Sequence, residues 1–369
     1  MSHVLFISHA RGIHGAEAVM VQAVKACATK GVWVTVVVPS IVPDQGLEAA
    51  LNGIFGVQII PLKYRPAGGS RLRTDFVLFY NIRAARELAD YIKRNNITTV
   101  YSCTSITILG ALVTKATGVR HVWHFHEPVD KRFGWHKSLT GYYRSFIQAS
   151  DTIICISHKQ QQEWEEALQM PLTNAQIIYN PIKRIEVKHK QPHEGISLGF
   201  IGHFEPRKNI ELLVHTFEKL HAKYPNTTLH LCGAIDEKDR RYIEKMTHMQ
   251  EPDIHILQQT SDIASFYSNI DILVLPSWKE TMPLVILEAM QAGVCVLQTN
   301  QSGMNELLEN KKETLFFAPD QPDTLLHLLE QCMDSDYRQS IAMSGQQKAL
   351  QLVNKTSFDE QITNLLCEL

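Results

Sequence analysis

Residues 4–38, VLFISHARGIHGAEAVMVQAVKACATKGVWVTVVV, decide the fold of the first half of the chain. Residues 4–8 form a short apolar run of the β type, and residues 32–38 form a second one. Between them, residues 16–30 place apolar side chains at helical spacing, and Gly31 ends the helix. A strand, a helix and a strand in this order predict a right-handed parallel βαβ unit.

The same alternation continues to both sides of a polar, basic stretch at 183–195, which is typical of a linker. Before the linker we expect strands at 99–102, 121–125 and 152–156, and helices near 80–95 and 105–117. After it we expect strands at 196–201, 228–232, 254–257, 270–275, 294–297 and 315–317, with helices at 209–221 and 237–249 among those between them. Near-continuous apolar strands that alternate with helices predict two doubly wound, parallel α/β domains.

The composition is that of an ordinary globular protein, with 44% apolar and 20% charged residues in a chain of 369. It excludes intrinsic disorder, collagen-like repeats and a small disulfide-rich scaffold. No apolar run approaches the ~18 residues of a membrane-spanning helix, and the N-terminus has no secretory signal pattern. The seven cysteines form no CxxC pair, which favours free thiols, a cytoplasmic location and no zinc site.

Charge is distributed unevenly between the two halves. Residues 1–185 hold 20 Lys and Arg against 12 Asp and Glu, a net charge of +8, whereas the remainder has −10. Cations and aromatic side chains mix at 131–146, and Lys63, Arg65, Arg71 and Arg73 form another basic group. We therefore expect the first half to contact an anionic membrane surface or acceptor; the alternative is a helix packed into its own domain with a solvated face. Long blocks of like charge are absent, so no nucleic-acid partner is expected.

The segment most informative about chemistry is 276–293, PSWKETMPLVILEAMQAG, which follows the apolar run at 270–275. Thr281 is a candidate helix N-cap, and Pro283 suits the first helical turn. Glu280 then lies in the loop before the helix, either as a ligand-binding carboxylate or as a solvated residue.

Glu288 lies within this helix among apolar neighbours, where a carboxylate needs a hydrogen-bonding partner. Hydroxyl groups of a sugar or a ribose would suit it; the alternative is a bond to neighbouring backbone. The N–H groups of the first helical turn, including those of Met282, Leu284 and Val285, suit a phosphate.

Glu280-x7-Glu288 after a strand resembles the E-x7-E signature of family-4 retaining glycosyltransferases of GT-B fold. Four further segments resemble that family in the same order: 15–17 (GAE) its G-G-A-E loop, 180–182 (NPI) its N-G-V segment, 200–209 (FIGHFEPRKN) its V-G-R-L-x-x-x-K-G segment, and 302–306 (SGMNE) its G-G-x-x-E turn. Together these motifs extend the resemblance over nearly the whole chain.

The resemblance implies that Glu280 binds hydroxyls of the donor sugar, Glu288 binds the ribose of the nucleotide, and Lys208 neutralises the departing diphosphate. It also assigns the donor site to Gly15, Gly202, Arg207, Thr281, Met282, Leu284 and Val285. Glycine at the first of these positions permits a close approach of backbone to ligand.

Position 203 departs from the family pattern, because His203 stands where the family normally has an arginine. An imidazole is charged near neutral pH only if the bound diphosphate raises its pKa. We expect either that His203 is protonated by the bound diphosphate or that Arg207 takes over part of its role; transfer activity could also be weaker than usual.

His124 and His126 lie at the end of the strand expected at 121–125, on the same side of it. The family presents a histidine to the donor and acceptor at this place, and His126, nearer the strand end, is the better match; Glu127 is the runner-up. No third ligand at metal-site spacing accompanies the histidines, and Asp334-Ser-Asp336 is far from any strand end, so we expect no metal.

The expected fold is therefore GT-B: two Rossmann-like domains, 1–185 for the acceptor and 186–352 for the nucleotide-sugar, facing a cleft, with helix 353–369 crossing back to the first. The resemblance implies metal-independent, retaining transfer from a nucleotide-sugar, a UDP-sugar above others, to a hydroxyl of a glycan, a lipid-linked or another cell-envelope acceptor. No cofactor is expected. The alternatives are a non-catalytic GT-B partner subunit, or a GT-B epimerase or phosphorylase.

Overall fold

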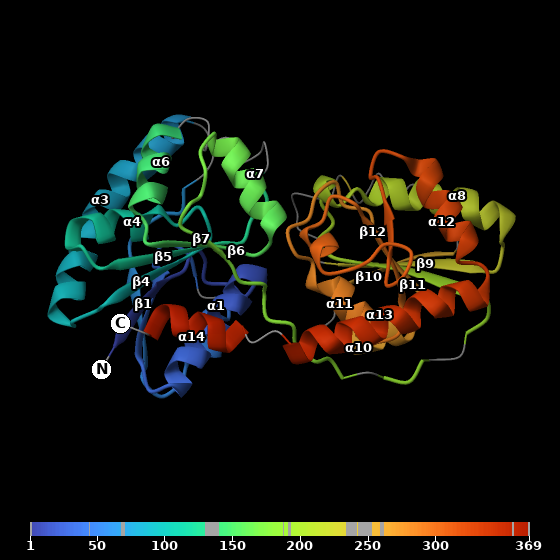
Figure 1. Cartoon of the computed structure of the whole chain (residues 1–369), viewed down its shortest axis with the longest axis horizontal. Coiled ribbons are helices and arrows are strands. Elements are labelled where there is room, and N and C mark those ends of the chain that lie inside the picture. The colour runs from blue at the N-terminus through green and yellow to red at the C-terminus, as the bar shows by residue number, and fades with distance from the viewer. Residues whose placement is uncertain are drawn as a thin grey trace. The chain divides into compact units, whose positions relative to one another are not determined.

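The structure is a computed structural model that describes residues 2–43, 45–67, 71–129, 140–186, 188–190, 193–233, 242, 253–258, 262–355 and 358–367. The chain forms two compact units, Met1–Pro181 with Ser357–Leu369, and Ile182–Thr356. The boundaries expected at 185 and 352 lie a few residues from these. Each unit contains its own parallel sheet with helices on both faces (Figure 1).

The first unit has a seven-stranded sheet in the order β3-β2-β1-β4-β5-β6-β7. Its strands are β1 (His3–Ile7), β2 (Trp33–Pro39), β3 (Val57–Leu62), β4 (Thr99–Cys103), β5 (Arg120–Phe125), β6 (Thr152–Cys155) and β7 (Ala175–Ile177). Its helices are α1 (Gly15–Thr29), α2 (Leu47–Leu51), α3 (Arg71–Arg94), α4 (Ile108–Thr117), α6 (Thr140–Ala149), α7 (His158–Leu168) and α14 (Phe358–Cys367).

The predicted βαβ unit is confirmed, because β1, α1 and β2 each lie within one residue of the expected ranges and the two strands pair in parallel. The edge strand β3 was not predicted. It is only partly buried and contains Pro61, which cannot donate a hydrogen bond to a sheet and is tolerated at an edge.

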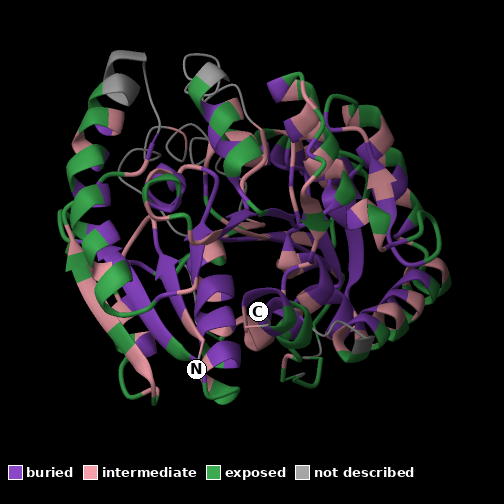
Figure 2. Cartoon of the chain, turned by 60° about the vertical axis from the view of Figure 1, so that its left-hand side comes forward, coloured by how far each residue is buried: buried purple, intermediate pink, exposed green. Residues whose placement is uncertain are grey.

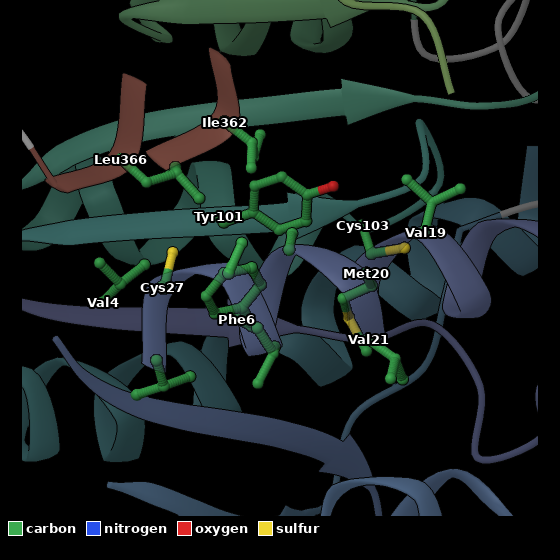
Figure 3. Packing of buried hydrophobic residues seen from close by; sticks show 14 of the residues in the cluster. Val4, Phe6, Val19, Met20, Val21, Cys27, Tyr101, Cys103, Ile362 and Leu366 are labelled. Carbon is green, nitrogen blue, oxygen red and sulfur yellow. The ribbon is translucent and has the colours of Figure 1, made fainter. Parts of the chain in front are cut away.

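Helix α14 packs on the first unit, although it follows the whole second unit in the sequence. Its residues Ile362 and Leu366 are buried in one cluster with Phe6 and Tyr101 of the sheet (Figure 3). The Arg120 guanidinium donates a hydrogen bond to the Leu365 carbonyl at 2.6 Å, which satisfies one of the last carbonyls of the helix. The C-terminal helix is thus part of the first unit's core.

Helices α3, α4 and α6 cover the opposite face of the first sheet (Figure 1). In α6, Tyr143 and Ile147 are buried against the sheet, and Arg144 donates a hydrogen bond to the Leu168 carbonyl at 2.6 Å. The strands between the two edges of this sheet are buried along most of their length, whereas helices expose their outer sides (Figure 2). Helix α6 is therefore packed into its own unit, as the alternative expects, and it exposes Tyr142; the contact with an anionic surface stays a prediction.

The second unit has a six-stranded parallel sheet in the order β10-β9-β8-β11-β12-β13. Its strands are β8 (Ile196–Ile201), β9 (Thr227–Gly233), β10 (Ile254–Gln258), β11 (Ile272–Leu275), β12 (Cys295–Thr299) and β13 (Leu315–Phe317). Its helices are the 3-10 helix η1 (Pro206–Lys208), α8 (Ile210–Lys223), α10 (Ile263–Ser268), α11 (Leu284–Gln291), the 3-10 helix η2 (Gly303–Glu306), α12 (Pro322–Gln331) and α13 (Ser335–Lys355). The helix expected at 237–249 lies outside the described residues, apart from position 242.

Candidate functional site

The centre of the second sheet is the place where its strand order reverses, between β8 and β11. The loops that leave the carboxyl ends of two such strands diverge, and ligands of open α/β folds bind in the space that this leaves. The loop after β8 carries Arg207 and Lys208, and the loop after β11 carries Glu280. The fold thus brings residues more than seventy positions apart to one edge of the sheet.

These three side chains form a compact charged cluster. The Lys208 Nζ lies 2.6 Å from one carboxylate oxygen of Glu280, and an Arg207 Nη lies 3.3 Å from the other. Arg207 also pairs with Glu205 at 2.6 Å. Glu280 is only 8% exposed, so the cluster holds two cations and a carboxylate in a largely water-excluded position.

The buried carboxylate stays ionised because of its cations. Burial alone would raise the pKa of Glu280, but the charges of Lys208 and Arg207 outweigh it and lower the pKa. In the same way, burial disfavours the Arg207 guanidinium, yet Glu280 and Glu205 raise its pKa. The Glu280 carboxylate is therefore ionised at neutral pH. The alternative of a solvated loop residue is wrong, because Glu280 is buried and paired.

The predicted turn at 302–306 lies directly beside Glu280. The Glu280 N–H donates to the Gln301 carbonyl at 3.0 Å, and the Gly303 N–H donates to the Glu280 carbonyl at 3.1 Å. The Ser302 hydroxyl accepts the N–H of Met304 at 3.1 Å and caps η2. Two of the segments that suggested the family are therefore bonded to each other through backbone.

Unusual backbone conformations shape the loop after β8. Gly202 has φ 156°, and a Cβ at Gly233, at the end of β9, would lie 1.9 Å from the Gly202 carbonyl oxygen. Asn209 is left-handed at φ 52°, which explains how asparagine replaces the glycine of the family pattern at this position. Its side-chain amide donates to the Pro319 carbonyl at 3.0 Å, and this fixes the chain immediately after Lys208.

Glu288 lies in α11 and has a partner that the sequence did not reveal. The Tyr267 hydroxyl, on α10, donates to a Glu288 carboxylate oxygen at 3.0 Å. Burial raises the pKa of Glu288, while the bond to Tyr267 and the charge of Lys183 act in the opposite direction. The partner of the Glu288 carboxylate is thus a side chain on another helix, and not the neighbouring backbone of the alternative interpretation.

Helix α11 starts later than predicted. Its N-cap is Pro283, with φ −75° and ψ 103°, so Thr281 is not the cap and Pro283 is not in the first turn. Leu284 and Val285 open the helix, and their N–H groups belong to the turn that lacks intrahelical acceptors. Met282 is buried next to this end, and Thr281 is partly buried.

His203 is exposed on the loop after β8, and the ion pairs of the cluster join Glu280 to Lys208 and to Arg207. Its carbonyl accepts the Glu205 N–H at 3.1 Å, which helps to shape the turn toward Arg207. Arg207 is bonded within the cluster and shares the Glu280 carboxylate with Lys208. Which of His203 and Arg207 acts on the diphosphate stays a prediction.

In the first unit, His124 lies near the end of β5, and His126 directly follows that strand. Their rings are 3.9 Å apart between centroids, and the His124 Nδ1 lies 2.5 Å from the Tyr101 hydroxyl. Burial lowers the pKa of His126 to about 3. The Glu127 carboxylate accepts both the N–H and the hydroxyl of Ser105 at 3.0 Å, so the runner-up residue anchors a loop.

The sequence interpretation missed His9 and the role of Glu17. Gly15 is the first residue of α1, and no atom lies within 4 Å of the place where a Cβ would stand. This open space would let a ligand approach the backbone closely. Glu17, in the first turn, is buried and pairs with His9 Nδ1 at 2.8 Å. Two signals in the sequence could have found this pair. Glu17 belongs to the GAE segment that resembles the family motif, and His9 follows β1 closely enough to lie at the carboxyl edge of the sheet.

Two further findings concern metals and membranes. Among the described residues, no group of three or more His, Cys, Asp or Glu side chains could hold a metal ion. None of the helices in the described ranges combines the length and the apolar character needed to cross a bilayer. The basic segment at 131–139 lies outside the described residues, as do the side chains of Arg71 and Arg73.

Comparison with known proteins agrees with this arrangement. The model of the family described as "Glycosyltransferase Family 4" matches residues 13–184, and that of "Glycosyl transferases group 1" matches residues 181–348. An uncharacterized glycosyltransferase of Haemophilus influenzae is 22% identical over 310 residues, 83% of each chain.

Two other proteins are similar to this chain. The Anabaena protein HepE, crystallised with UDP and with UDP-glucose, superposes over 100% of both chains with TM-scores of 0.80 and 0.78 at 17% identity. An N-acetylgalactosaminyltransferase of Campylobacter jejuni that acts on diacetylbacillosaminyl-diphospho-undecaprenol is 34% identical over 113 residues, 30% of this chain and 28% of its own. The chain belongs to the GT-B glycosyltransferases, with a family-4 type first half.

Proposed function

We propose that this glycosyltransferase moves a sugar from a UDP-sugar to a hydroxyl of a glycan or lipid-linked cell-envelope acceptor, with retention of configuration and without a metal ion. The observation that carries the proposal is the cluster of Lys208, Arg207 and Glu280 at the reversal point of the second sheet. A diphosphate leaving group develops negative charge as its bond to the sugar breaks. Cations preorganised in a water-excluded site stabilise that charge.

Glu280 has two roles in this mechanism. Its ion pairs hold Lys208 and Arg207 in place, and a carboxylate has about four lone-pair directions, so its oxygens can also accept hydroxyls of the donor sugar. Glu288, held by Tyr267, would accept the ribose hydroxyls of the nucleotide. The first-turn N–H groups of Leu284 and Val285 suit the phosphates.

The transfer itself is a front-face exchange. The bond from the sugar carbon to the diphosphate oxygen breaks, and the acceptor oxygen bonds to the same face of that carbon. The departing diphosphate takes the proton of the acceptor hydroxyl, so the protein supplies position and charge. His126, neutral at physiological pH, would hydrogen-bond a hydroxyl of the sugar or of the acceptor.

The choice of donor and acceptor rests on the similar proteins. The crystallised Anabaena protein binds UDP-glucose, which supports a UDP-sugar here. The Campylobacter jejuni protein acts on a lipid-linked diphospho-sugar, which supports a lipid-linked acceptor.

A turnover experiment tests the proposal. The protein is incubated with UDP-glucose, UDP-galactose, UDP-N-acetylglucosamine or UDP-N-acetylgalactosamine and a mixture of short glycan and undecaprenyl-diphospho-sugar acceptors. Release of UDP, with a product whose new linkage has the α configuration of the donor by NMR, supports it. An inverted linkage contradicts retention. UDP binding without turnover favours the non-catalytic partner subunit, and sugar isomerisation or phosphorolysis favours the epimerase or phosphorylase.

We also propose that the first unit contacts anionic membrane through α3. Phe79 and Phe76 on this helix are 78% and 55% exposed, and the exposed Arg83 and Arg86 follow on the same helix. Aromatic rings beside arginines suit the lipid interface.

Liposome sedimentation tests the membrane contact. The wild-type protein should sediment with anionic vesicles more than with neutral ones, and Phe79→Ser should reduce this. Phe55→Ser, which alters a ring that is 88% exposed elsewhere in the unit, is the matched control. Equal sedimentation with both kinds of vesicle contradicts the contact.

A further inference from the structure

Two cysteines from opposite ends of the chain meet in the core of the first unit. The Cys367 sulfur, on α14, lies 3.6 Å from the Cys27 sulfur, on α1, although the two residues are 340 positions apart. They are thiols rather than a disulfide. Cys27 belongs to the buried cluster that contains Ile362 and Leu366, and its side chain points toward Leu366 (Figure 3). The fold thus brings together a thiol pair that no motif in the sequence indicates.

The packing of α14 against α1 holds the two thiols at this distance. Near the start of α14, the Gln22 side-chain amide donates to both carboxylate oxygens of Asp359, at 2.9 and 3.0 Å. Cys27 and Cys367 meet further along both helices. Side chains therefore join the two helices at two places, and the thiol contact is part of a packed interface.

The two thiols differ in their access to solvent. Cys27 is 0% exposed, whereas Cys367 is only partly buried. The neighbouring Cys367 thiol, burial and the charge of Asp359 raise the pKa of Cys27. An oxidant in solution would therefore react with Cys367 first, and Cys27 would supply the sulfur that completes a disulfide.

A disulfide between the two cysteines requires only a short movement. Its S–S bond is ~2.05 Å long, so the two sulfur atoms, which are 3.6 Å apart, must approach each other by about 1.6 Å. Cys367 is the last residue of α14, and helix ends fray more readily than helix centres. The end of α14 can therefore supply this movement without a change in the buried part of α1.

We propose that Cys27 and Cys367 are a modification site: a dithiol that a low-molecular-weight disulfide such as oxidised glutathione converts into an intramolecular disulfide. The Cys367 thiolate attacks one sulfur of the oxidant and releases one glutathione, which takes up the proton that Cys367 lost. The mixed disulfide on Cys367 is then attacked by the Cys27 sulfur, and the second glutathione leaves with the Cys27 proton. The protein loses two electrons and two protons, and the oxidant becomes two glutathione thiols.

The disulfide would attach α14 covalently to the first unit. In the reduced protein this attachment depends on noncovalent contacts, among them the buried side chains of Ile362 and Leu366 and the bond from Arg120 to the Leu365 carbonyl. A cross-link from α1 to α14 removes the open conformations in which α14 has left the unit. Oxidation should therefore slow hydrogen exchange in α14, and this expectation does not depend on the proposed transfer reaction.

Oxidation of the folded, full-length chain tests the site. The protein is incubated with oxidised glutathione, the remaining thiols are alkylated, and the peptides are identified by mass spectrometry. We expect a cross-linked peptide pair that contains Cys27 and Cys367, and hydrogen exchange in α14 that is slower by about tenfold or more than in the reduced protein. Cys367→Ala should abolish the cross-link, and Cys27→Ala should stop the reaction at the mixed disulfide on Cys367.

A second thiol pair provides the matched control. In the second unit, Cys295 is hydrogen-bonded to Cys332, and both residues are 0% exposed. Because burial keeps both thiols from the oxidant, they should remain unmodified in the folded protein under the same conditions. Cys295→Ala should leave the cross-link between Cys27 and Cys367 unchanged.

Three results would overturn the proposed site. In the first, both Cys27 and Cys367 remain thiols in the presence of the oxidant. In the second, the wild type accumulates the mixed disulfide on Cys367, which would mean that Cys27 cannot reach it. In the third, the cross-link forms only in denaturant, as expected for Cys295 and Cys332. If Cys27→Ala does not fold, Cys367→Ala decides, because oxidation of Cys27 in that variant contradicts the order of attack.

Discussion

The residues that we propose to contact donor and acceptor differ in charge between the two units. In the second unit, Lys208 and Arg207 carry permanent charges that are held by the buried carboxylate of Glu280. In the first unit, the residues at and after the end of β5 are His124 and His126, and burial keeps both of them neutral. Under the proposed function, the edge of the second sheet would stabilise a charged leaving group, and the edge of the first sheet would orient uncharged hydroxyls.

This division follows from elementary electrostatics. A permanent cation can be kept in a dry site only with a counter-charge, and Lys208 and Arg207 are held by the carboxylates of Glu280 and Glu205. A neutral imidazole needs no counter-charge and donates and accepts one hydrogen bond each, as a hydroxyl requires. Four variants test this difference between the two units, and Lys208→Ala should lower turnover the most.

Lys208→Ala should have the largest effect. Removal of the cation leaves the departing diphosphate without its main counter-charge, and turnover of the UDP-sugar should fall about a thousandfold, chiefly in kcat. Steady-state kinetics measure this, with circular dichroism to check folding. Lys219→Ala, an exposed lysine of α8, is the control. A loss below about tenfold would mean that the second unit does not supply the charge.

His126→Asn should reduce turnover by about tenfold to a hundredfold, because one hydrogen bond to the sugar or acceptor is lost. The pKa of His126 is about 3, so its protonation does not change above about pH 5, and the wild type and the variant should show the same acid limb. The measurement is kcat/KM between about pH 5 and pH 8, with the exposed His158→Asn as control. An acid limb that disappears in the variant would show that His126 acts as a charged group.

Tyr267→Phe should weaken UDP binding by about tenfold, since Glu288 loses a hydrogen bond that orients its carboxylate. The loss of this bond also lets burial raise the pKa of Glu288 further, so the deficit should grow as the pH falls from about 7 to about 5. Calorimetry with UDP measures both effects. Tyr224→Phe, at an exposed tyrosine, should change neither; a deficit that is independent of pH would reject this role of Glu288.

His203→Arg should have the smallest effect, with turnover preserved or raised by a few-fold. An arginine at this exposed position adds a permanent cation where the related family has one, whereas His203→Ala should lower turnover modestly. The comparison of the two variants by kcat measures the effect. A loss of about a hundredfold in His203→Arg would contradict the view of position 203 as a phosphate cation.

Much of the second unit's site could be predicted from the sequence, because its residues lie in contiguous motifs after recognisable strands. Lys208 and Glu280 each follow an apolar strand, and parallel topology brings such loops to one edge. The partners of these residues could not be predicted. Tyr267 lies on a short helix with no motif, and only the packing of α10 against α11 brings its hydroxyl to Glu288.

The predicted start of α11 was wrong, and the reason lies in the backbone conformation of a single residue. Thr281 and Pro283 both have the composition of a helix start, but Pro283 adopts an extended ψ and so caps the helix instead of opening it. In the first unit, the pair of His9 and Glu17 depends on the packing of α1 against the end of β1. No sequence motif links His9 to Glu17, so the spacing of apolar residues could not predict their contact.

The proposed function requires that the carboxyl edge of the second sheet binds the nucleotide of the donor. The most direct measurement is the thermal stability of the wild type and of Glu288→Ala with UDP, GDP, ADP and dTDP, each with and without an attached sugar. Binding to the folded state alone raises the free energy of unfolding, by about 2.7 kcal/mol at a ligand concentration of a hundred times Kd. We expect a rise in Tm with the uridine series that is lost in Glu288→Ala. No rise with any nucleotide, or an equal rise in the variant, would contradict it.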